Sequence, residues 1–152
     1  MKQSPGDREL YARLGPSKFS GEGFLGTDAR SVDEIITADE RTLEHFGIDR
    51  ESIVNALEKA YQQAREGLGA DIEIIPGVTA VFYESMGRIP SPFRGDGVFE
   101  KGEAVITDTS SNDQMIITKL SVHLIKKHGF FQGKGSRFRI DPEKAIRILR
   151  IV

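Results

Sequence analysis

The chain has 152 residues, of which 38% are hydrophobic and 29% charged, with a net charge of −2 and no cysteine. This length and composition predict one globular domain and argue against wholesale disorder. The lack of cysteine excludes a disulfide framework and any thiolate metal site. Residues 1–18 have no apolar signal segment, and no apolar run approaches the roughly 20 residues that span a bilayer. We therefore expect a cytoplasmic protein with no membrane partner.

The charge is unevenly distributed along the chain. Residues 1–118 contain 12 Lys and Arg against 21 Asp and Glu, whereas residues 119–152 contain 9 against 2. A basic segment can face an anionic ligand, or it can pack beside the acidic part of its own fold or of a partner subunit. We favour the second alternative, packing of the basic segment beside acidic residues. We also expect the chain to form a homo-oligomer.

Residues 1–28 combine two prolines and five glycines with scattered aromatic side chains. This composition suits neither a helix nor a strand, but it is too aromatic for a solvated tail. We expect disorder up to about Tyr11, followed by an extended arm that docks its aromatic residues on a core. In an oligomer that core can belong to a neighbouring subunit.

Two helices are predicted over residues 31–67. Ser31 and Glu34 have the spacing of a capping box, Gly47 ends the first helix, and Asp49 caps the second. A helix pair of this kind raises the possibility of DNA binding. The exposed positions are mostly acidic and would repel phosphates, so we interpret the hairpin as a packing or dimerisation unit.

β-Branched residues dominate the next part of the chain and predict strands over residues 71–75, 78–85, 103–109 and 114–120. The links between these strands are too short for parallel crossovers, so the sheet should be mostly antiparallel with about four to five strands. The exception is the segment 86–102, which we expect as a long loop with a short strand near residues 98–100. Loops of this length in compact domains are often functional.

The C-terminal part is predicted as a helix over Ser121–His128, a Gly-rich turn, a strand over Ser136–Ile140 and a last helix. Asp141 and Pro142 have the residue types of an N-cap and a first helical position. The fold class is therefore α+β in a single domain, residues 1–152. It comprises the arm (1–28), the helical hairpin (31–67) and a β-rich part (71–152) that ends in helix–strand–helix.

Flexible backbone coincides with exposed cations in two places. Gly133 and Gly135 flank Lys134, which allows successive backbone N–H groups to turn toward one point. Arg137 and Arg139 share one face of the expected strand, about 6.6 Å apart, where they could straddle a phosphate or carboxylate. The alternative is a turn followed by a solvated edge strand. The predicted anion-binding residues, including two from the long loop, are Arg88, Arg94, Lys134, Arg137 and Arg139.

The histidines do not have metal-binding spacing. His123 and His128 are five positions apart, roughly 140° around a helix, whereas helical ligand pairs are three or four apart. We therefore predict no metal and no cofactor, and the alternative left open is a histidine that meets a carboxylate from a distant part of the chain. No established catalytic motif occurs, and the acid–base candidates are Glu84, Asp96 and His123, provided that folding brings them together.

Three functions stay open at this point. The preferred one is a binding or regulatory protein that self-associates and recognises an anionic group. The second is a small enzyme for a phosphorylated or carboxylated metabolite, in which Asp96, Glu84 or His123 moves a proton. The third is a structural subunit with a large apolar interface. A pocket that unites a cation with a titratable group would favour the enzyme.

Overall fold

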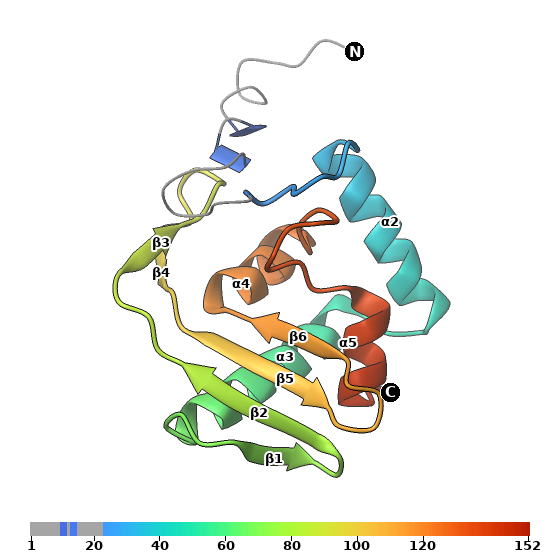
Figure 1. Ribbon diagram of the computed structural model, residues 1–152. Helices are drawn as coiled ribbons and strands as arrows, with labels where there is room; N and C mark the ends of the chain where they lie inside the picture. Colours follow the sequence, from blue (N-terminus) through green and yellow to red (C-terminus); the bar gives the residue numbers. More distant parts are fainter. Residues whose placement is uncertain (1–9, 12, 15–22) are drawn as a thin grey trace.

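The computed structural model describes residues 10–11, 13–14 and 23–152 of the chain (Figure 1). In chain order, the elements are α2 (Val32–His45), α3 (Arg50–Glu66), β1 (Ile72–Ile75), β2 (Val78–Tyr83), β3 (Arg88–Pro90), β4 (Val98–Glu100), β5 (Glu103–Asp108), β6 (Gln114–Ile117), α4 (Lys119–His128) and α5 (Pro142–Leu149). This mixture of helices and antiparallel strands confirms the predicted α+β class.

Two separate sheets are present in the described part of the chain. The larger has the strand order β1-β2-β5-β6, with every neighbouring pair antiparallel. The smaller is a hairpin of β3 and β4. Helix α3 crosses behind the larger sheet in Figure 1. Side chains of β2, β5 and β6 alternate between buried and less buried positions, which places one face of the sheet against this helix.

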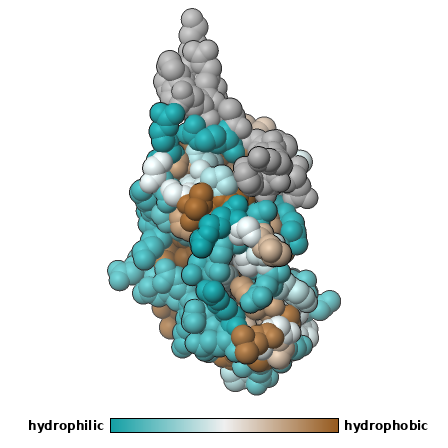
Figure 2. All heavy atoms as spheres, turned by 90° about the vertical axis from the view of Figure 1, so that its left-hand side faces the viewer, coloured by the Kyte–Doolittle hydropathy of each residue, from teal (hydrophilic) through white to brown (hydrophobic). Residues whose placement is uncertain are grey.

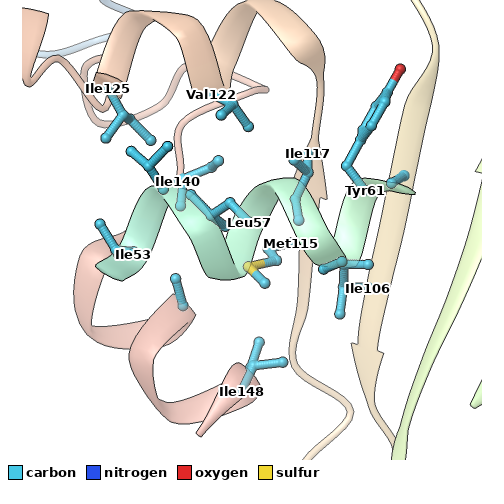
Figure 3. Close-up of a cluster of buried hydrophobic side chains, with 14 of the residues drawn as sticks. Ile53, Leu57, Tyr61, Ile106, Met115, Ile117, Val122, Ile125, Ile140 and Ile148 are labelled. Carbon is cyan, nitrogen blue, oxygen red and sulfur yellow. The ribbon is translucent and has the colours of Figure 1, made fainter. Parts of the chain in front are cut away.

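The main core lies between α3 and the larger sheet (Figure 3). Ile53, Leu57 and Tyr61 recur along one stripe of α3, as expected for an amphipathic helix. They pack with buried residues from the sheet, from α4, from α5 and from the segment before α5. Those labelled in Figure 3 are Ile106, Met115, Ile117, Val122, Ile125, Ile140 and Ile148.

A second apolar cluster holds α2, α4 and the β3–β4 hairpin together. Its buried members are Leu14, Phe24, Val32, Ile35, Leu120, Leu124 and Phe130. Ile89, Phe93 and Phe99 of the hairpin region are partly buried against it. Helix α4 therefore contributes to both clusters, and the loop between β3 and β4 is held close to α4.

The predicted helix caps are confirmed. Ser31 and Glu34 form the capping box of α2, and the side chains of Asp49 and Asp141 cap α3 and α5. Helix α4 begins two residues earlier than predicted, because the Thr118 side chain accepts a hydrogen bond from the backbone of Ser121. Gly129 ends α4 with a left-handed φ of 67°, a conformation that glycine adopts readily.

The strand predicted over Ser136–Ile140 is wrong. The chain makes turns there: the N–H of Arg139 bonds to the carbonyl of Ser136 over 3.2 Å. The preceding turn, through Gly133 and Lys134, forms backbone hydrogen bonds with the stretch before α2, and residues 136–140 have no partner strand. Of the predicted arm, Leu14 and Phe24 are buried and joined by a backbone hydrogen bond of 2.7 Å. Much of the remaining arm lies outside the described residues.

Figure 2 views the side of the molecule that carries the β3–β4 hairpin. This side is mainly hydrophilic, and its hydrophobic patches are small and separate. Met86 and Val98 are among the exposed apolar residues. Within the described ranges, no helix combines the length and apolar character needed to cross a membrane.

Candidate functional site

The most concentrated group of polar side chains surrounds Asp96. This residue lies in the loop between β3 and β4, and its side chain is only 1% exposed. Its Oδ2 atom is 2.8 Å from Nε2 of His128 and 3.0 Å from Nε2 of His123. Its Oδ1 atom is 2.7 Å from Nζ of Lys127. Three residues of α4 thus converge on one buried carboxylate.

The loop that carries Asp96 is closed by its own hydrogen bonds. The Ser91 hydroxyl donates to Oδ2 of Asp96 over 2.9 Å and accepts from the backbone N–H of Phe93. The N–H of Ser91 bonds to the carbonyl of Gly97 over 3.1 Å. Gly95 and Gly97 have φ values of 88° and 89°, which side chains other than glycine rarely adopt. This tight turn directs the Asp96 side chain toward α4.

Aromatic rings hold the two imidazoles in place. The Phe93 ring stacks on His128 with centroids 3.8 Å apart and planes at 17°. Phe99 packs against His123 at 4.6 Å. Both phenylalanines come from the hairpin region, so the segment that supplies Asp96 also fixes the ring orientations. The cluster is therefore positioned by packing as well as by charge.

The charge of Asp96 is compensated inside the cluster. Burial alone would raise the pKa of its carboxyl group, but hydrogen bonds from Lys127, His128 and Ser91 outweigh burial and hold that pKa well below its usual range. His123 is different: its Nε2 is close to Asp96 and shielded from solvent, yet makes no well-aligned hydrogen bond with the described residues. The Nε2 atom of His123 is therefore within hydrogen-bonding distance of the Asp96 carboxylate, but its geometry is not that of a hydrogen bond.

A pocket of about 470 Å³ opens beside the cluster, between α3 and α4. Its lining residues recur at helical spacing on both helices, and β4 adds one ring. They are Glu58, Tyr61, Gln62, Phe99, Lys119, Val122, His123 and Lys126. His123 therefore belongs to both the Asp96 cluster and the pocket wall.

Ion pairs surround this pocket. Lys126 lies 3.6 Å from Glu58, and Lys119 lies 3.2 Å from Glu100. The Tyr61 hydroxyl donates to Glu100 over 2.9 Å, and burial together with this carboxylate raises the pKa of Tyr61 above its usual value. The side chain of Lys119 is about half exposed, and that of Lys126 is about two thirds exposed. Such exposed pairs are weak, so a ligand can displace them.

Of the predicted acid–base residues, Asp96 and His123 meet and Glu84 does not join them. Glu84 lines a smaller pocket of about 180 Å³ with Arg65 and Glu100. His128 and Lys127 were not predicted for the site. Both lie in the last turn of α4 before Gly129, where the helix dipole favours cations, so their positions in the sequence have a structural explanation that does not require a site.

The five-residue spacing of His123 and His128 does not prevent the two imidazoles from sharing one site. His123 and His128 have ring centroids 6.3 Å apart, yet the Asp96 carboxylate lies between them and reaches both. Asp96, His123 and His128 form the one group of three metal-ligating side chains in the described ranges, with ligand atoms within 4.8 Å of one another. The predicted absence of a metal was based on the lack of cysteine and on the helix spacing, neither of which shows whether a carboxylate from another part of the chain lies beside the histidines.

The five predicted anion-binding cations do not share one set of partners. Arg137 pairs with Glu103 on β5 at 3.0 Å, whereas Arg139 makes a two-pronged bond to Asp39 on α2 at 2.8 and 2.9 Å. Arg88 and Arg94 are exposed in the hairpin region. The loop of this hairpin reaches the start of the segment between α4 and α5, where the rings of Phe93 and Phe130 have centroids 6.0 Å apart. External anion binding by these residues stays a prediction.

The Gly133–Gly135 turn has an internal anionic partner. The backbone N–H of Lys134 donates to the carboxylate of Asp28 over 3.0 Å. A Cβ on Gly133 would come within 2.3 Å of the Leu25 carbonyl oxygen. The glycines thus allow two backbone segments to cross in close contact, which gives this motif a structural role.

Comparisons with protein-family models, curated proteins and solved structures give no match to the chain.

Proposed function

We propose that the chain is a metal-dependent enzyme in which Asp96, His123 and His128 bind one divalent transition-metal ion. The observation that carries this proposal is the convergence of two imidazole Nε2 atoms on one carboxylate oxygen, at 2.8 and 3.0 Å. Metal–ligand bonds of about 2.0–2.2 Å place ligand atoms roughly 3–4 Å apart, so little movement is needed to accept an ion. The solvent-shielded Nε2 of His123, which makes no well-aligned hydrogen bond with the described residues, is consistent with a role as a metal ligand.

The ligand types favour a zinc-like ion over calcium or magnesium. Imidazole suits zinc, iron, copper and nickel, whereas the hard cations prefer oxygen ligands throughout. Three protein ligands with an open position are the pattern of catalytic zinc sites, while structural sites have four. His123 also lies in the wall of the 470 Å³ pocket, so a ligand bound there would contact one of the three proposed metal ligands, which supports a catalytic role.

Residues around the three ligands would orient them. Ser91 holds the Asp96 carboxylate, and Phe93 and Phe99 fix the imidazole planes. Such outer contacts commonly tune metal affinity about 10- to 100-fold. The ammonium of Lys127 opposes the ion electrostatically, so affinity should be moderate.

A second candidate is an acid–base enzyme without a metal. The observation in its favour is that Lys127, His128 and Ser91 already compensate the charge of Asp96. In that case Asp96 would orient His123, and His123 would exchange a proton with a ligand in the pocket. The two candidates differ in whether an ion binds.

Metal titration separates them. Chelator-treated protein is titrated calorimetrically with Zn²⁺, and with Co²⁺ while its visible absorption is followed. We expect one ion per chain with micromolar or tighter affinity, and loss of binding in His123→Phe and His128→Phe, which retain aromatic packing. His45→Phe is the control, since His45 is exposed on α2. Absence of binding to the unaltered chain would refute the metal proposal and leave the acid–base candidate.

The sequence-based expectations of self-association and a cytoplasmic location are part of the same proposal. The lack of cysteine suits a reducing compartment. Sedimentation velocity over a range of protein concentrations would test self-association, and a single monomeric species throughout would contradict it.

A further inference from the structure

We infer that the pocket between α3 and α4 binds the phosphoryl group of a small organic molecule. The inference rests on the proposed metal site, because His123 belongs to both. The pocket volume of about 470 Å³ lies within the range of small-molecule sites, roughly 300–1,000 Å³. It is large enough for an organic body as well as one anionic group.

The cations of the pocket are arranged around His123 on a single helix face. Lys119 precedes His123 by four residues and Lys126 follows it by three, so both lie one turn away on the same side of α4. A group bound at His123 would thus have an ammonium on either side. The metal ion at the Asp96 cluster would add further positive charge beside it.

Existing partners leave these lysines available. Glu58 is the one acidic residue in the described lining of the pocket, and it is 3.6 Å from Lys126, a long and exposed contact. Lys119 is held by Glu100, which also accepts from Arg65 and Tyr61. Glu100 therefore keeps two other donors when Lys119 turns to a ligand. The exchange costs little because exposed ion pairs contribute little to stability.

The side-chain types favour a phosphoryl group over a carboxylate. At pH 7 a phosphoryl group carries a charge of roughly −1.5 to −2, whereas a carboxylate carries a single negative charge, so the two lysines of the pocket lining attract the phosphoryl group more strongly. Lysines act as separate point charges and suit the several oxygens of a phosphoryl group. Phe99, Tyr61 and Val122 supply an apolar surface for the organic part of the ligand.

Phenyl phosphate is a suitable probe, with benzoate as its carboxylate counterpart. Each is titrated calorimetrically into the Co²⁺-loaded full-length chain. We expect phenyl phosphate to bind, benzoate to bind at least about tenfold more weakly, and Lys119→Met/Lys126→Met to weaken phenyl phosphate binding at least about tenfold. Lys59→Met/Lys101→Met has the same change in net charge and should bind like the unaltered chain.

Several results would overturn the inference. These are no phenyl phosphate binding, equal binding of benzoate, or an unaffected Lys119→Met/Lys126→Met variant with native circular dichroism. Loss of binding in Lys134→Met/Arg137→Met instead would move the anion site to the Gly-rich turn. Co²⁺ stoichiometry is measured for every variant, so failure of the pocket is distinguished from failure of the metal site. Equal binding to the metal-free chain would refute the dependence on the metal.

Discussion

Asp28 and Lys134 are 106 positions apart in the chain, and the carboxylate of Asp28 accepts the backbone N–H of Lys134 over 3.0 Å. The same carboxylate is bound by the guanidinium of Arg30 at 2.7 and 2.9 Å. The side chain of Asp28 is only 4% exposed. This one carboxylate therefore ties the entry to α2 to the Gly-rich turn after α4.

The first prediction concerns Asp28→Asn. The hydrogen bonds from Arg30, opposed by burial and assisted by Lys134, hold the pKa of Asp28 well below its usual range in the folded chain. The ionised form therefore stabilises the fold above pH about 4, and that contribution is lost as the pH falls below this value. At pH 7 we expect Asp28→Asn to lower the free energy of unfolding by about 1–3 kcal/mol.

Urea unfolding at pH 7 and at pH 3 checks this prediction. The difference between Asp28→Asn and the unaltered chain should shrink at the lower pH. Asp71→Asn removes a carboxylate at an exposed position and serves as control. A difference that is the same at both pH values would show that the ionised form of Asp28 is not the source of the stability.

The second prediction compares two ion pairs that the sequence placed in one anion site. The Arg139 and Asp39 side chains are 10% and 5% exposed, whereas Arg137 is 55% exposed beside Glu103. Removing one partner of a buried pair strands the other charge, so Arg139→Met should cost about 3–5 kcal/mol. Arg137→Met should cost less than about 1 kcal/mol. Chemical unfolding measures both, and equal costs would contradict the burial of the Arg139 pair.

The third prediction addresses the backbone crossing. A methyl group on Gly133 would meet the Leu25 carbonyl, so Gly133→Ala should destabilise the chain by about 1–3 kcal/mol through steric conflict. Gly47→Ala is the comparison, because Gly47 has a φ of 67° but open space around its Cα. Its cost should be that of the backbone conformation alone, about 1 kcal/mol. Thermal unfolding of both variants tests this order, and a neutral Gly133→Ala would contradict the close crossing.

The fourth prediction uses the lysine beside the Asp96 cluster. If the cluster holds a divalent ion, removing the ammonium of Lys127 reduces repulsion of that ion, so Lys127→Met should bind Co²⁺ about three- to tenfold more tightly. Lys59→Met is the control on α3, where no change is expected. Weaker binding in Lys127→Met would indicate that Lys127 mainly holds Asp96 in place.

Local signals predicted the elements well because they depend on neighbouring residues. The Ser31–Glu34 box and the Asp141 cap act within three or four positions, and the structure has both. The predicted strand over 136–140 failed because a strand also needs a partner edge. There the Gly-rich turn crosses the 23–28 stretch instead, and the Ser136 hydroxyl bonds to the Gly23 carbonyl over 3.1 Å.

The sequence allowed individual residues of the site to be predicted, but not their arrangement in space. Asp96 and His123 were both named from the sequence, yet their meeting depends on a hairpin whose aromatic residues pack on the second apolar cluster. Lys119 and Lys126 share a helix face with His123, and this arrangement could be predicted from their spacing in the sequence. The significance of that face emerges only when α3 supplies the opposite wall.

The division of the site between α4 and the β3–β4 hairpin has a consequence for its motions. Helix α4 is anchored in both apolar clusters, whereas the hairpin is a short two-stranded sheet outside the main one. Local openings take place where few apolar contacts must be broken, so the hairpin should detach at a lower free energy than α4 unfolds. Asp96 would leave with the hairpin while both histidines stay on the helix. An ion or ligand that contacts both α4 and the hairpin would then hold the hairpin in place, and amide exchange in residues 88–100 would slow when it binds.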